Sequence, residues 1–343
     1  MIASFSLPLL LVVTLVAGVV IVAAGVRMTD YADRLADQTG LGEAIAGGVL
    51  LGMATSLGGV VVSITAAAEG RADLAFSNAV GGIAAQTAFL AVADLSYRRA
   101  NLERASAEQG HVFQAALLTL MLSLPMAGAM GPDLSILGVH PVSLMLPVIY
   151  VAGVRATQRL EERPAWRRVR MRGDREDTPD EPEASGAAIL PTALRFAALA
   201  VVLGFAGYTI AKAGGALSDR LGVSESAVGA LLTAVTTSLP ELITTLAAVR
   251  RGALQLAVGG IVGGNIFDVL FLTLADASYA GDSLYQDVSG GPLFWLAVGL
   301  VMTALLLLGL LFRHEGGPKG IGFESASMLG VYAAAVGLQA LMG

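Results

Sequence analysis

The sequence predicts an all-α polytopic membrane protein with ten transmembrane helices, arranged as two inverted repeats of five helices. Three observations predict this fold class. Of the 343 residues, 55% are hydrophobic and only 14% are charged, whereas a soluble domain carries about 25% charged residues. Long stretches hold no charged residue at all, among them residues 9–26 and 293–312. The third observation is an internal repeat in which the two copies share short motifs such as Thr-Ser-Leu and Val-Gly-Gly.

Ten apolar blocks predict the ten helices, because a membrane-spanning helix needs about 20 mainly apolar residues. β-Barrel strands would alternate polar and apolar residues, and these blocks are continuous. The blocks cover residues 4–26, 41–68, 74–96, 112–130, 134–153, 187–214, 226–249, 254–276, 291–312 and 322–342. They predict a first membrane repeat at residues 1–153, a charged cytoplasmic linker at 154–186 and a second membrane repeat at 187–343.

The basic residues predict how the chain is oriented. Eighteen of the 21 Lys and Arg residues lie in, or next to, the loops that follow the odd-numbered blocks. Because cytoplasmic loops are enriched in Lys and Arg, we expect both termini outside. We expect an integral membrane protein of the plasma membrane. The expected partners are membrane lipid and inorganic cations, with no nucleic acid. Cysteine is absent, which excludes disulfides and thiolate metal sites.

The internal repeat is the strongest signal. Residues 40–94 match residues 222–276 without a gap, with 18 identities in 55 pairs. Because one repeat holds five blocks, an odd number, the second copy enters the membrane from the opposite side. Inverted repeats are typical of secondary transporters, which bind their substrate near the bilayer midplane. The identical pairs include Thr55-Ser56-Leu57 with Thr237-Ser238-Leu239, Val80-Gly81-Gly82 with Val262-Gly263-Gly264, and Asp94 with Asp276, two residues expected at solvated helix ends.

Two polar clusters interrupt blocks seven and eight and predict an intramembrane cation site. In residues 236–241, Pro240 cannot donate a backbone hydrogen bond, so we expect a kink that frees the carbonyl oxygen of Thr236. The second cluster, residues 259–268, ends at Asp268. No Lys or Arg in the centres of the neighbouring blocks can pair with Glu241 or Asp268. Each carboxyl group is therefore expected to hold a cation or a proton.

These motifs resemble those of the calcium/cation antiporter superfamily, the sodium/calcium exchangers. Residues 237–241 (T-S-L-P-E) and 263–268 (G-G-N-I-F-D) are similar to the family's motifs. The resemblance implies exchange of Ca2+ against Na+, or against K+ or H+ in some branches. It implies alternating access, with the first and sixth helices sliding past the site. It also implies that Glu241 and Asp268 are cation ligands.

The first copy is degenerate, since the family usually has a second T-S-L-P-E there. Gly59 stands at the register of Glu241, and Gln86 at that of Asp268, which leaves at most two negative charges. We expect a secondary active Ca2+/Na+ antiporter, not an enzyme, that has no cofactor and binds the transported cations (Ca2+, Na+ or H+). The alternatives are a proton-coupled or monovalent cation exchanger and a non-transporting membrane scaffold or sensor. The candidate cation ligands are Glu241, Asp268, Thr237, Ser238, Thr55, Ser56, Gln86 and Asn265.

Overall fold

The protein is built from helices, as the sequence predicts. A computed structural model describes residues 2, 5–39, 52–96, 102, 106, 108–162, 189–251, 254–312 and 322–342. Most of the predicted linker at 154–186 lies outside these residues. The principal helices are α1 (Leu7–Thr39), α3 (Gly52–Ala68), α4 (Ala72–Ser96), α6 (Gln109–Met130), α7 (Pro141–Glu162), α8 (Ile189–Leu221), α15 (Gly290–Phe312) and α16 (Phe323–Met342).

Blocks seven and eight are each divided into several helical pieces. Block seven comprises α9 (Glu225–Ala227), the π-helix η3 (Val228–Thr233), α10 (Ala234–Thr237) and α11 (Leu239–Arg251). Block eight comprises α12 (Leu254–Asp268) and α13 (Leu270–Ser278), and a short helix, α14 (Leu284–Asp287), follows it. Among the described residues, these pieces and the helices above follow the order of the ten predicted blocks.

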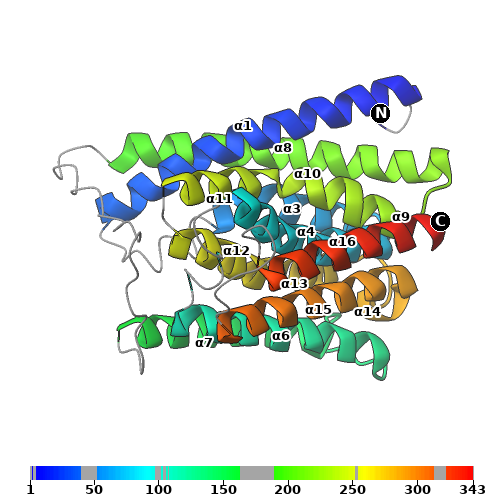
Figure 1. Ribbon diagram of the computed structural model, residues 1–343. Helices are drawn as coiled ribbons and strands as arrows, with labels where there is room; N and C mark the ends of the chain where they lie inside the picture. The colour runs from blue at the N-terminus through cyan, green and yellow to red at the C-terminus, as the bar shows by residue number, and fades with distance from the viewer. Residues whose placement is uncertain are drawn as a thin grey trace.

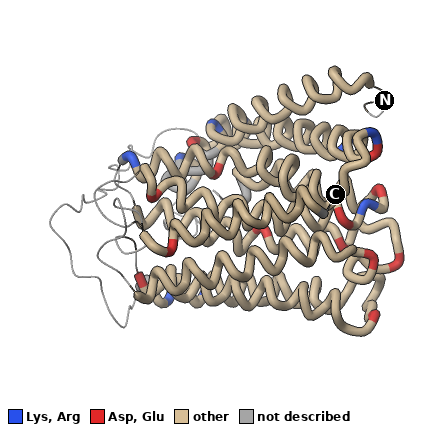
Figure 2. Tube along the Cα trace, turned by 45° about the vertical axis from the view of Figure 1, so that its right-hand side comes forward, with Lys and Arg blue, Asp and Glu red and all other residues tan. Residues whose placement is uncertain are grey.

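The described part of the chain holds six helical stretches that are long and apolar enough to cross a membrane. A seventh is added if the bent pair Glu225–Thr237 and Leu239–Arg250, which meet at 46°, forms one span. The charged residues gather towards the two ends of the helices, with few in the middle (Figure 2). Both marked chain ends lie at the same end of the bundle (Figures 1 and 2).

Some helix boundaries differ from the predicted ones. Helices α4 and α15 begin and end within two residues of their predictions, but α1 continues to Thr39, well beyond residue 26. Helix α7 begins at Pro141, not at residue 134. The preceding residues form a tight turn in which Leu137 and Gly138 have φ angles of 55° and 82°. Apolar composition predicted a continuous helix there, but the turn delays its start to Pro141, a residue well suited to the first helical position.

The helices form two packed units. The main hydrophobic core joins α4, α6, α12, α13, α15 and α16. A separate, smaller apolar cluster joins α1 and α8, with Val62 of α3 as its buried contact to the bundle. In Figure 1, α1 and α8 run side by side along one face of the bundle, in opposite directions. The α1–α8 pair therefore has an apolar interior of its own.

The α1–α8 pair approaches the bundle at two positions that are equivalent in the repeat. A Cβ added to Gly25 of α1 would lie 2.7 Å from Cγ of Pro240. A Cβ added to Gly207 of α8 would lie 2.5 Å from the carbonyl oxygen of Gly58. Gly25 and Gly207 are separated by the repeat offset of 182 residues, as are Gly58 and Pro240. Glycine is required at both contacts, because any side chain would push the helices apart.

Asp94 and Asp276 are buried rather than solvated, which corrects the expectation for them. Their exposed fractions are 1% and 4%. Asp94 accepts a hydrogen bond from the Gly322 backbone N–H at 3.0 Å, next to the start of α16, and Asp276 accepts one from the His140 N–H at 2.8 Å, next to the start of α7. Residues 140 and 322 are again 182 apart. A buried backbone N–H needs an acceptor, and each aspartate supplies one to the other half of the chain.

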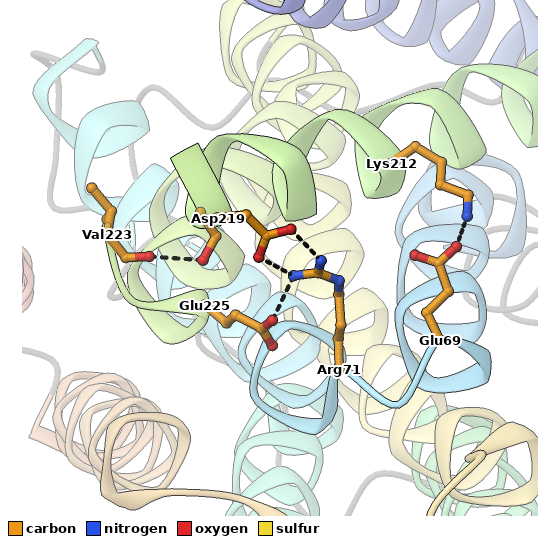
Figure 3. A network of polar contacts seen from close by, with 7 residues as sticks. Glu69, Arg71, Lys212, Asp219, Val223 and Glu225 are labelled. Atoms are coloured by element: carbon orange, nitrogen blue, oxygen red, sulfur yellow. Dashed lines mark hydrogen bonds and ion pairs between the residues drawn. The ribbon is translucent and has the colours of Figure 1, made fainter. Parts of the chain in front are cut away.

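An ionic network ties α8 to the bundle at one end (Figure 3). Arg71, between α3 and α4, contacts Asp219 of α8 and Glu225 of α9, each at 2.6 Å. Lys212 of α8 pairs with Glu69, in the turn directly after α3. The hydrogen bond from Arg71 to Asp219, together with the nearby negative charges of Asp219 and Glu225, raises the pKa of Arg71 above its ordinary value. The guanidinium therefore stays charged throughout the working pH range.

Gly81 and Gly263 are equivalent in the repeat, but the structure predicts opposite results when each is changed to Ala. A Cβ at Gly81 would lie 2.5 Å from the Cα of Ala230 in η3, whereas nothing lies within 4 Å of a Cβ at Gly263. Gly81→Ala should destabilise the protein by about 1–3 kcal/mol because backbone must move. Gly263→Ala should be neutral or slightly stabilising. Thermal unfolding of the two variants in detergent checks this, and equal effects would contradict the packing described here.

Candidate cation site

One acidic residue of the candidate site lies beside a helix break, and the other lies within a helical stretch. Ser238, with φ −94° and ψ 2°, separates α10 from α11. Glu241 lies in the first turn of α11, where the helix dipole favours a negative charge. The break predicted around Pro240 is thus present, centred two residues before the proline. In block eight, Asp268 is the last residue of α12, and Val269 continues the helical path into α13 (φ −59°, ψ −28°), so that Leu254–Ser278 forms one apolar stretch.

Polar side chains from both repeats meet between the Ser238 break and Asp268. Gln86 Nε2 donates to Asp268 Oδ2 at 2.6 Å and to Ser238 Oγ at 3.2 Å. Ser56 Oγ donates to Glu241 Oε1 at 3.4 Å and also interacts with Asp268. Gln86 and Asp268 are equivalent residues of the two repeat copies, so this hydrogen bond joins one copy directly to the other.

Three further candidates lie around this group. Thr55 is buried and hydrogen-bonds the Glu241 carboxyl group. Asn265 precedes Asp268 by one helical turn, and its Nδ2 donates to Thr87 Oγ1 at 3.0 Å. The Thr237 hydroxyl donates to the Thr233 carbonyl oxygen, which turns its proton towards its own helix. The candidate ligands are thus brought together, with Thr237 the least directed towards the carboxyl groups.

Four buried oxygen atoms at this site have no hydrogen-bond partner: Gln86 Oε1, Glu241 Oε2, Asn265 Oδ1 and Asp268 Oδ1. Their residues are between 0% and 6% exposed. Buried polar atoms without partners are rare in folded proteins, and each needs an explanation. Two carboxylate and two amide oxygens form a donor set suited to a hard cation such as Ca2+ or Na+.

The site contains few charges. Within the described ranges, neither Glu241 nor Asp268 forms an ion pair, and no group of three or more His, Cys, Asp or Glu side chains is placed to hold a metal ion. The carboxyl groups therefore depend on neutral donors and on whatever cation or proton they bind. Carboxyl groups at membrane depth are costly to retain and are characteristic of ion pathways.

Sequence reasoning missed two residues of the site. Thr87 holds the Asn265 amide, and the ring of Phe271 lies against Gly59. Gly59 stands where the second copy has Glu241. The loss of the larger side chain at this position indicates that another group could fill the space beside it. Phe89 and Phe271 are identical in the repeat, but apolar matches between membrane helices carry little information.

Comparisons with known proteins show the family to which the chain belongs. The chain matches the sodium/calcium exchanger protein family over residues 9–152 and 191–341. It is 27% identical to the inner membrane protein YrbG of Escherichia coli, covering 89% of this chain and 88% of YrbG. It is 26% identical to the putative antiporter CaxA of Alkalimonas amylolytica, covering 88% and 92%. A structure of the sodium-calcium exchanger NCX_Mj superimposes with a TM-score of 0.61 at 17% identity, covering 97% and 99%.

The fold and the family match define an integral membrane transporter of the cation antiporter class, not an enzyme. The chain belongs to the sodium/calcium exchanger family. The likeness to NCX_Mj extends over nearly the full length of both chains and supports the all-helical fold.

Proposed function

We propose that this protein exchanges Ca2+ for Na+ across the membrane, and that the cations bind between Gln86, Glu241, Asn265 and Asp268. The observation that carries this proposal is the set of four buried oxygen atoms without hydrogen-bond partners. Thr55, Ser56, Thr237 and Ser238 add hydroxyl or carbonyl oxygens. Together with water, these groups can supply the six to eight oxygens that Ca2+ takes.

The helices of the ten predicted blocks are proposed to form two inverted repeats of five spans. Two pairs of repeat-equivalent contacts support this proposal: Gly25 with Pro240 and Gly207 with Gly58, and Asp94 with Gly322 and Asp276 with His140. A single contact between two equivalent residues, Gln86 with Asp268, also supports it. In each case a residue of one copy contacts the other copy. The marked chain ends at one end of the bundle fit an even number of crossings (Figure 1).

Alternating access is proposed to use the α1–α8 pair. Its separate apolar cluster allows it to move as a unit, and its contacts at Pro240 and Gly58 adjoin the polar motifs of the site. A displacement of this pair would uncover the site to one side and then to the other. With both termini outside, as the distribution of Lys and Arg suggests, residues 154–186 would be cytoplasmic.

Removing either carboxylate should abolish Ca2+ transport. In liposomes, Glu241→Gln and Asp268→Asn should each lower Ca2+ uptake by at least about 100-fold, since one negative charge among buried oxygens cannot balance a divalent ion. The matched control is Asp287→Asn, which should transport normally. Asp287 accepts a hydrogen bond from the Tyr279 hydroxyl near the end of the bundle, away from the candidate site. Normal uptake by both site variants would show that the site is assigned wrongly.

The counter-ion is identified by applying a Na+ gradient and a pH gradient separately. Na+ is the first candidate, and H+ is the second, because a carboxyl group can bind a proton as well as a metal ion. An outward Na+ gradient at equal pH should drive Ca2+ uptake, whereas a pH gradient without Na+ should not. Uptake driven by the pH gradient alone would replace Na+ by H+ in the proposal. If no gradient of Na+, K+ or H+ drives Ca2+ movement, a non-transporting role is favoured.

A further inference from the structure

Arg71 lies between two carboxylates that belong to different parts of the fold (Figure 3). On one side its guanidinium donates two hydrogen bonds to Asp219, from Nη1 to Oδ1 at 3.1 Å and from Nη2 to Oδ2 at 2.6 Å. On the other side Nη1 donates to Glu225 Oε1 at 2.6 Å. Asp219 lies in the last turn of α8, whereas Glu225 begins α9 in the bundle. The guanidinium therefore joins the α1–α8 pair to the bundle.

Gly215 of α8 leaves the space in which the Arg71 side chain sits. A Cβ at Gly215, one helical turn before Asp219, would lie 2.9 Å from Nε and 3.0 Å from Cζ of Arg71. The Arg71 side chain is 22% exposed. Two parallel hydrogen bonds between a guanidinium and a carboxylate form a stronger contact than a single exposed ion pair. Arg71 is thus seated against α8 and does not extend into solvent.

The contact between Arg71 and Asp219 depends on where the α1–α8 pair sits. Because Glu225 holds the guanidinium on the bundle side, Arg71 is not free to follow α8. A shift of α8 along its axis by one helical turn is about 5.4 Å. Such a shift would carry the Asp219 carboxylate beyond the roughly 4 Å over which ion pairs form. The contact therefore stabilises one position of the pair and not the other.

The basic residue of this contact is present in only one repeat copy. Asp219 corresponds to Asp37, which is also acidic, but Arg71 corresponds to Ala253. If the two copies were identical, exchanging their conformations would give access states of equal free energy in a symmetric membrane. Residues that differ between the copies make one state more stable than the other, and Arg71 is one of them.

The second ion pair of the network differs in this respect. Lys212 and Glu69 correspond to Asp30 and Arg251, which are again one acid and one base with the charges exchanged. Opposite charges thus stand at these positions in both copies and do not favour one access state by symmetry. Within this network, Arg71 is the residue that distinguishes the two states.

We propose that Arg71 is an ionic latch: by joining Asp219 to Glu225 it holds the α1–α8 pair in the position seen in the structure, and so sets the balance between the two access states. This inference rests on the alternating access of the proposed function and adds the residue that sets its resting balance. A partly exposed, bidentate ion pair should shift that balance by about three- to tenfold.

The distance between two spin labels reports this balance directly. Because the chain contains no cysteine, labels can be attached at Leu221→Cys, at the end of α8, and at Asp282→Cys, between α13 and α14; both residues are exposed. Pulsed EPR on the labelled protein in liposomes should show two distance populations, one for each position of the pair. Arg71→Gln should reduce the population that matches the structure about three- to tenfold relative to the other.

Asp73→Asn is the matched control. Asp73 lies two residues from Arg71, but it accepts hydrogen bonds from the backbone N–H and the hydroxyl of Ser289, so its contacts lie within the bundle. Its removal should leave the balance unchanged. If Arg71→Gln does not fold, Asp219→Asn removes the same contact at a side chain that is 57% exposed.

Exchanging the charges separates a latch from a merely structural role. Arg71→Glu and Asp219→Arg should each disturb the balance, because each places like charges together. The double variant Arg71→Glu/Asp219→Arg restores an ion pair between the same two positions and should return the balance towards that of the wild type. A purely structural role for Arg71 would not be rescued in this way.

Failure of the latch and failure of the proposed function give different results. The latch is overturned if Arg71→Gln keeps the wild-type balance, if Asp73→Asn shifts it as strongly, or if every variant shows a single distance population. The proposed function is contradicted instead if the wild-type protein moves no Ca2+ under any ion gradient, whatever the label distances show.

Discussion

The structure depends on one constraint, the burial of two carboxyl groups inside an apolar helical bundle where no ion pair reaches them in the described ranges. Glu241 and Asp268 are 6% and 2% exposed, and each keeps one oxygen without a hydrogen-bond partner. An unpaired charge buried in this way costs several kcal/mol. Part of this cost is offset by neighbouring polar groups, namely hydroxyl groups from α3, the Gln86 amide from α4 and the helix break at Ser238. In the proposed function, a bound cation supplies the rest.

The same constraint explains why block seven is broken at Ser238. A continuous α-helix satisfies its own backbone and offers no free polar groups at membrane depth. The 46° bend at Ser238 places a helix end beside Glu241, and the first turn of α11 favours the charge of this residue. In a membrane such irregular backbone is tolerated where it is enclosed by protein, and here the α1–α8 pair lies over the broken block at Thr236 and Pro240.

Much of the fold could be predicted from the sequence, because the cost of burying charge in lipid marks the helices by composition. The all-α class and the order of the helices were predictable for this reason, as was the kink near Pro240. The turn at Leu137 and Gly138 was not, since it lies within an apolar run and depends on backbone geometry. The burial of Asp94 and Asp276 also escaped prediction. Each accepts a hydrogen bond from a residue more than 130 positions away, and no local pattern reports such a partner.

Within the candidate site, the repeat identified Gln86 as the partner position of Asp268, and the two side chains are hydrogen-bonded. The seating of Phe271 against Gly59 could not be predicted, because a glycine indicates free space without showing what fills it. Binding of a cation among the unpartnered oxygens is tested most directly by anomalous scattering from crystals soaked with Mn2+ or Sr2+. A peak is expected at about 2.2–2.7 Å from oxygens of Glu241 and Asp268, with Gln86 and Asn265 in the same shell. A peak elsewhere, with these four oxygens still unpaired, would contradict it.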